Sequence, residues 1–75
     1  MIDYSPFWIT LQNSKESTYT LIKKYHISSS TINRLRKNKP VNTVTLNELC
    51  CILNCNIQDI AQYVPSEEDQ LLFSQ

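Results

Sequence analysis

Apolar residues recur at helical spacing along nearly the whole sequence. Strict alternation of apolar and polar residues, which is typical of a half-buried strand, never lasts beyond a few positions. A chain of 75 residues makes one small domain. The sequence therefore predicts an all-α fold, a compact bundle of about five short helices over residues 1–65, followed by an acidic tail over residues 66–75.

Capping residues and prolines predict where the first three helices begin and end. Ser5 is expected to cap the first helix, with Pro6 at its first position and its end near Asn13. Ser17 caps a second helix that runs to about residue 25. His26 and Ile27 interrupt it, and Ser28 caps a third helix over residues 29–37.

The second half of the chain shows the same signals. Asn42 or Thr43 is expected to cap a fourth helix, and Asn56 a fifth helix that stops before Pro65. The residues expected to face the core of the bundle are Phe7, Trp8, Leu11, Leu21, Ile22, Tyr25, Ile27, Ile32, Leu35, Leu46, Leu49, Cys50, Leu53, Ile57, Ile60, Ala61 and Val64.

Several classes of function lack their signatures. The three cysteines (Cys50, Cys51 and Cys55) form no CxxC pair, which favours small buried side chains over a disulfide or a zinc site. The chain contains no glycine, so it has no glycine-rich phosphate loop, and its lone histidine, His26, has no nucleophile at a catalytic spacing. We therefore expect that the protein is not an enzyme and binds no metal, cofactor or small-molecule ligand. No apolar run is long enough to span a membrane and no signal peptide is evident, so the cytoplasm is the expected location.

Charge is sharply segregated along a chain whose net charge is zero. Residues 15–39 hold seven basic side chains and one acidic one, Glu16, for a net charge of +6, and the six other acids give the remainder −6. Such a distribution is typical of a surface that meets an anionic partner, although basic residues also commonly line a solvated helix face. The basic residues are Lys15, Lys23, Lys24, Arg34, Arg36, Lys37 and Lys39.

This basic segment coincides with two short helices joined by a tight turn, which is the arrangement of a helix-turn-helix unit. Short side chains at Ser29 and Ser30 would let the third helix approach base edges, where Asn33 can pair with adenine and Arg34 with guanine. Alternatively, Ser28 to Thr31 only cap a solvated helix. The residues expected to bind double-stranded DNA are Ser17, Thr18, Ser28, Ser29, Ser30, Thr31, Asn33, Arg34, Lys37 and Lys39, with Lys23, Lys24 and Arg36 neutralising further phosphates.

From about Leu11 to Val64 the sequence resembles the Cro/repressor-like (XRE-type) helix-turn-helix family of bacterial and phage regulators, in a compact five-helix subgroup. The resemblance lies in Ser17-Thr18 with Leu21-Ile22, in residues 26–32 with Leu35, and in Val41-Asn42 with residues 46–60. It implies that the first half of the third helix reads bases and that the function is transcriptional control. The first hypothesis, which rests on the basic third helix, is therefore a sequence-specific DNA-binding regulator that acts as a homodimer on a pseudo-symmetric site.

Three positions depart from the family's usual residues. His26 stands where the family usually has glycine, and His is among the residues found at positive φ more often than most. Ile22 replaces a small alanine, and Ser29 replaces a frequent glutamine.

A second hypothesis is an antitoxin-like or adaptor module that keeps the same fold and captures a protein partner. It rests on the zero net charge and on the acidic tail, which ends in the apolar residues Leu71, Leu72 and Phe73. The tail can equally fray or pack on its own domain.

Overall fold

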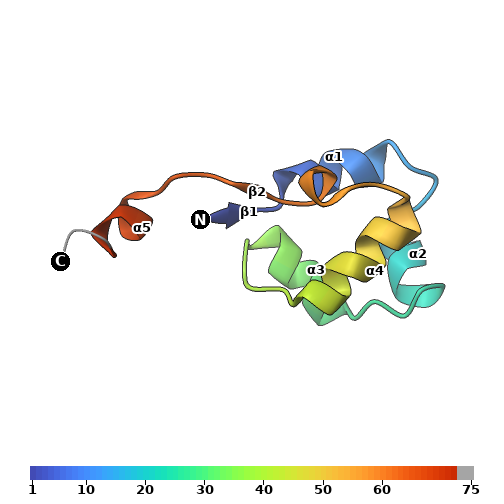
Figure 1. Cartoon of the computed structure of the whole chain (residues 1–75). Coiled ribbons are helices and arrows are strands. Elements are labelled where there is room, and N and C mark those ends of the chain that lie inside the picture. Colours follow the sequence, from blue (N-terminus) through green and yellow to red (C-terminus); the bar gives the residue numbers. More distant parts are fainter. Residues whose placement is uncertain (73–75) are drawn as a thin grey trace.

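The computed structural model describes residues 1–72 and confirms the mostly helical fold (Figure 1). Two very short strands pair beside the bundle, although the sequence showed no strand pattern. The elements are β1 (Ile2–Asp3), α1 (Ser5–Gln12), α2 (Thr18–Lys23), α3 (Ser29–Arg36), α4 (Thr43–Leu53), the 3-10 turn η1 (Ile57–Asp59), β2 (Gln62–Tyr63) and α5 (Glu67–Leu71).

Each of the first four α-helices contributes at least one fully buried side chain to the core. Burying each such side chain stabilises the fold by about 1.5–3 kcal/mol. Among the expected core residues, Ile57 and Val64 are instead exposed, at 53% and 39%. Tyr4, which the helical pattern did not include, is buried. The largest fully buried side chains are Phe7, Leu21, Leu35, Leu49 and Ile60.

The cysteines do not share one environment. Cys50 and Cys55 are partly buried against the core, as expected, whereas Cys51 is exposed because it points away from the apolar face of α4. Burial raises the pKa of the Cys55 thiol to about 11, and the neighbouring Cys50 and Asp59 add to the shift. The neutral thiol of Cys55 therefore serves as a small packing group.

Three of the expected helix caps are confirmed, and one is displaced by a residue. Ser17, Ser28 and Asn42 each accept a hydrogen bond from the backbone N–H three residues later. Ser5, however, lies inside α1, and Tyr4 occupies the N-cap position. The Ser5 hydroxyl therefore donates to Asp3 Oδ1 at 2.9 Å instead of capping the helix.

The prediction of a fifth helix after Asn56 is wrong. Asn56 and Asp59 form a capping box that closes only the 3-10 turn η1, after which the chain extends into β2. β2 pairs antiparallel with β1, so that Ile2 lies opposite Tyr63. The short apolar pattern after Asn56 fits a helix and an extended strand equally well. The extended conformation is favoured here because β1 supplies hydrogen-bond partners for the backbone of β2.

The fifth α-helix is α5, in the acidic tail. Ser66 caps it by accepting from the Asp69 N–H at 3.2 Å, and the Asp69 carboxylate pairs with the N-terminal amine of Met1. Figure 1 shows α5 beyond β1, away from α1 to α4. The boundary expected at residue 65 stays a prediction, and Phe73 lies outside the described residues. No helix within residues 1–72 is long and apolar enough to cross a membrane.

Candidate nucleic-acid interface

The turn between α2 and α3 depends on a left-handed residue. His26 has φ 60°, so it takes the conformation that glycine usually supplies in such turns. Ile27 follows it into the core, and its N–H donates to the Leu21 carbonyl at 2.9 Å. The expected break near His26 is therefore confirmed. Ile22, although larger than alanine, packs partly buried against the core.

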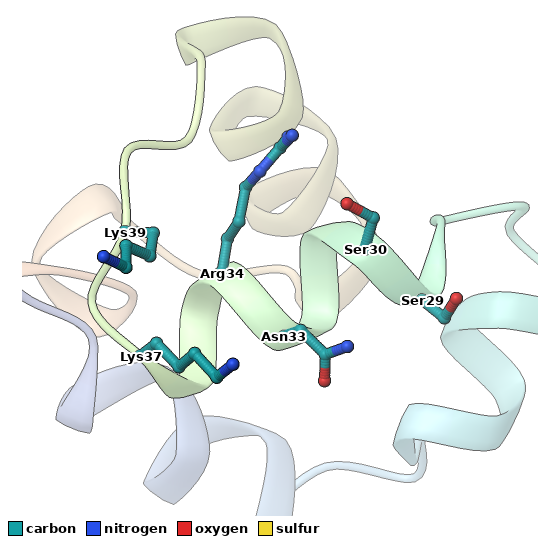
Figure 2. Close-up of a pocket in the computed structure, with 6 residues that line it drawn as sticks. All are labelled: Ser29, Ser30, Asn33, Arg34, Lys37 and Lys39. Atoms are coloured by element: carbon teal, nitrogen blue, oxygen red, sulfur yellow. The ribbon is translucent and has the colours of Figure 1, made fainter.

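The outward face of α3 carries two rows of polar side chains, whereas Ile32 and Leu35 are buried on the opposite face. Ser29, Asn33 and Lys37 follow one another at one side of the helix in Figure 2, and Ser30 and Arg34 at the other. All five are exposed. The core therefore leaves Asn33 and Arg34 accessible to a partner.

These rows border an open hollow of about 420 Å³. Its lining contains three cations and no acid, so an anionic ligand meets a favourable potential over this face. The hollow runs along α3 and includes two residues that follow the helix, Lys37 and Lys39 (Figure 2). The lining residues are Ser29, Ser30, Asn33, Arg34, Lys37 and Lys39.

Ser28 and Thr31 are occupied by the cap of α3. The Ser28 hydroxyl accepts from the Thr31 N–H at 3.1 Å, and the two hydroxyl oxygens lie 2.9 Å apart. These capping contacts alone explain why hydroxyl residues occupy positions 28 and 31. A role in DNA contact stays a prediction for both, because a capping hydroxyl on an exposed helix end retains further lone pairs.

The start of α2 holds a second pair of expected contact residues. Ser17 and Thr20 form a capping box, with the Ser17 N–H donating to Thr20 Oγ1 at 2.8 Å, and Thr18 is the first helical residue. At the other end of α2, Lys23 and Lys24 are exposed. Lys24 Nζ lies 5.2 Å from the centre of the Tyr25 ring.

Arg36 makes contacts that the sequence analysis did not include. Its guanidinium carbon is 5.4 Å from the centre of the Trp8 ring, and its Nη1 donates to Asn33 Oδ1 at 3.3 Å. It thus bridges α1 and α3 while its side chain stays exposed, and its expected role in neutralising phosphates stays a prediction. The spacing of Asn33 and Arg36, three positions apart on one helix, was the available signal for this contact.

The end of α3 is tied to the N-terminal strand through Asp3. The Asp3 carboxylate accepts from Gln62 Nε2 at 2.9 Å, from the Ser5 hydroxyl at 2.9 Å and from Asn38 Nδ2 at 3.3 Å. These bonds, led by that of Gln62, hold the pKa of Asp3 below its ordinary value of 3.8. Within residues 1–72, no group of three or more acids, cysteines or histidines is placed to hold a metal ion.

Two short helices joined by a left-handed turn, with the second one polar and basic on its outer face, define a helix-turn-helix domain. The model of the Cro/C1-type HTH DNA-binding domain matches residues 7–66, and the chain belongs to this family.

Comparison with solved structures supports the same fold. The chain is similar to the crystal structure of the transcriptional regulator VanUg, form II, with a TM-score of 0.77 and 29% sequence identity over 87% of each chain. No curated protein sequence gives a significant match.

Proposed function

We propose that this protein is a transcriptional regulator that binds specific double-stranded DNA sequences with α3 in the major groove. The observation that carries the proposal is the exposed, acid-free face of α3, which presents hydroxyl, amide, guanidinium and ammonium groups together. A B-form major groove about 12 Å wide admits one α-helix with such groups directed at base edges. The structural neighbour, itself named a transcriptional regulator, supports the assignment.

The roles divide along α3 by position and chemistry. Asn33 and Arg34, in the middle of the exposed face, are proposed to read adenine and guanine, and Ser29 and Ser30 allow the backbone to approach the bases. Lys37 and Lys39 at the far end are proposed to bind phosphates. Ser17, Thr18, Ser28 and Thr31, at the starts of α2 and α3, are proposed to contact the DNA backbone beside the groove.

Selection from a random duplex pool tests this function. A regulator of this kind enriches one sequence, and its affinity for that duplex falls steeply as salt rises, because each neutralised phosphate adds about 0.9 to the logarithmic slope. A homodimer would enrich two inverted half-sites about 10 base pairs apart. A pool that shows no enrichment, or an affinity indifferent to salt, would rule the proposal out.

A second candidate, a protein-capture module, is favoured by the position of α5. This helix lies away from the bundle in Figure 1 and carries three acids in its first turn, and the adjacent Leu72 is 70% exposed. Deleting residues 66–75 distinguishes the two. If the tail carries partner capture or dimerisation, the deletion abolishes it; if both survive intact, this candidate fails.

A further inference from the structure

The amide of Asn33 is joined to the hydrophobic core through a short series of contacts. Phe7 is fully buried, and its ring meets that of Trp8 edge to face, with centroids 4.8 Å apart and planes at 76°. The Arg36 guanidinium lies over Trp8, and its Nη1 donates to Asn33 Oδ1. A base-reading candidate on α3 is thus held by a residue that itself rests on α1.

We propose that Arg36 is a positioning residue that fixes the orientation of the Asn33 amide for base reading. The proposal rests on the DNA-binding function argued above. It assigns Arg36 a role in sequence preference, although its own guanidinium is directed at Trp8 and Asn33 and not at a base.

The chemistry of the two groups explains how the orientation is fixed. An Asn amide has two orientations related by a half-turn about its last bond, and they exchange the oxygen with the NH2 group. A guanidinium has only donors, so only the orientation with Oδ1 toward Arg36 forms a hydrogen bond. The reverse orientation would place two donors against each other. Arg36 therefore selects one of the two.

This selected orientation suits adenine. Nδ2 faces away from Arg36 and is available to donate to adenine N7, while the second lone pair of Oδ1 can accept from the adenine N6 amine. Without Arg36 the amide is free to turn, and a turned amide offers a donor where adenine also has a donor. Loss of Arg36 should therefore reduce discrimination at a single base pair.

Lys37 provides a matched control, because it is the next residue and carries the same charge. Within residues 1–72, its side chain has no hydrogen bond or ring contact, and Figure 2 shows it beside the hollow on α3. Methionine replaces either residue with a chain of similar length that has no donor, and it can still pack on Trp8 at position 36.

The first test needs no DNA. In nuclear magnetic resonance spectra of the free protein, Arg36→Met is expected to shift the side-chain NH2 signals of Asn33, whereas Lys37→Met leaves them in place. If Arg36→Met leaves the Asn33 side-chain signals unchanged, the two residues do not interact and the proposal is overturned.

The second test measures binding to four duplexes that differ only at the base pair whose preference Asn33→Ala abolishes. Arg36→Met is expected to reduce the preference for adenine there by about tenfold, the size of one good side-chain contact to a base. Lys37→Met should weaken all four duplexes equally. In the Asn33→Ala background, Arg36→Met should leave the preference as it is, because Arg36 acts through Asn33.

Arg36→Lys separates geometry from charge. It keeps the positive charge but lacks the planar group that spans Trp8 and Asn33. Adenine preference should therefore fall, while the salt dependence of binding stays as in the unmodified protein.

The two tests also separate failure of this inference from failure of the function. If the unmodified protein binds a specific sequence but Arg36→Met weakens all duplexes alike and lowers the salt slope by about 0.9, Arg36 is a phosphate contact and only the inference fails. If the unmodified protein binds no duplex, the proposed function fails and the positioning role fails with it.

Discussion

The backbone N–H of Tyr4 donates to Asn38 Oδ1 at 2.9 Å, although the two residues are 34 positions apart. Asn38 has φ 54° and directly follows the C-cap residue of α3. The N–H of the next residue, Lys39, donates to the Arg34 carbonyl at 2.9 Å, which ends the helix. The Asn38 side chain also donates through Nδ2 to Asp3. Asn38 thus both ends α3 and attaches that end to the start of α1.

Replacing Asn38 with alanine should lower the free energy of unfolding by about 2–4 kcal/mol. It leaves the partly buried Tyr4 N–H without its acceptor and places a Cβ-bearing residue, without a compensating side chain, at positive φ. Asn38→Gly is the control, because glycine adopts this φ freely and loses only the hydrogen bonds. Urea unfolding should rank the natural protein above Asn38→Gly, and Asn38→Gly above Asn38→Ala. Equal stability for the two variants would contradict the conformational part of this account.

His26 offers a test of backbone conformation alone, because its side chain is exposed. A left-handed residue other than glycine costs about 1–2 kcal/mol, and more for a β-branched one. We therefore expect His26→Gly to be as stable as the natural protein or up to about 1 kcal/mol more stable, and His26→Val to be less stable by about 1–2 kcal/mol. Thermal unfolding measures both. If His26→Val matched His26→Gly, the turn would not require the left-handed conformation.

Much of the helical framework could be predicted because its signals are local. Caps such as Ser17, Ser28 and Asn42 bond to backbone groups three residues away, so sequence spacing alone identifies them. The exposed positions of Asn33 and Arg34 also follow from one helix, since Ile32 and Leu35 define its buried face.

The features that sequence reasoning missed depend on residues far apart in the chain. β2 forms because β1 lies beside it, and nothing near Gln62 indicates a partner at the N-terminus. Arg36 was assigned to phosphates because its charge was visible, whereas its contact with Trp8 requires the packing of α1 on α3. Local patterns cannot reveal contacts of this kind.

The strand pair should respond to acid through Asp3. Hydrogen bonds from Gln62, Ser5 and Asn38 favour the charged carboxylate, so the folded-state pKa lies below the ordinary value of 3.8. The resulting stability is fully present above that value and is lost as the pH falls below it toward the folded-state pKa. The protection of the β1 and β2 amides against hydrogen exchange, relative to the intrinsic rate at each pH, should therefore fall at a pH below 3.8. Asp3→Asn should remove much of this pH dependence, and an unchanged profile would contradict the role of Asp3.

Arg34 and Lys37 should affect DNA binding in different ways, although both line the same hollow. Arg34 lies in the second half of α3, and a guanidinium can donate two hydrogen bonds to O6 and N7 of a guanine. Arg34→Ala should therefore reduce discrimination at one base pair by about 1–3 kcal/mol. Lys37 is the C-cap residue of α3, at the end of the helix that we propose lies beside the phosphates. Lys37→Ala should therefore weaken specific and unrelated duplexes alike and lower the salt slope by about one unit. Titrations of both variants against matched and mismatched duplexes at several salt concentrations measure these effects. A uniform loss for Arg34→Ala, or a loss of preference for Lys37→Ala, would show that the assigned roles of these two residues are wrong.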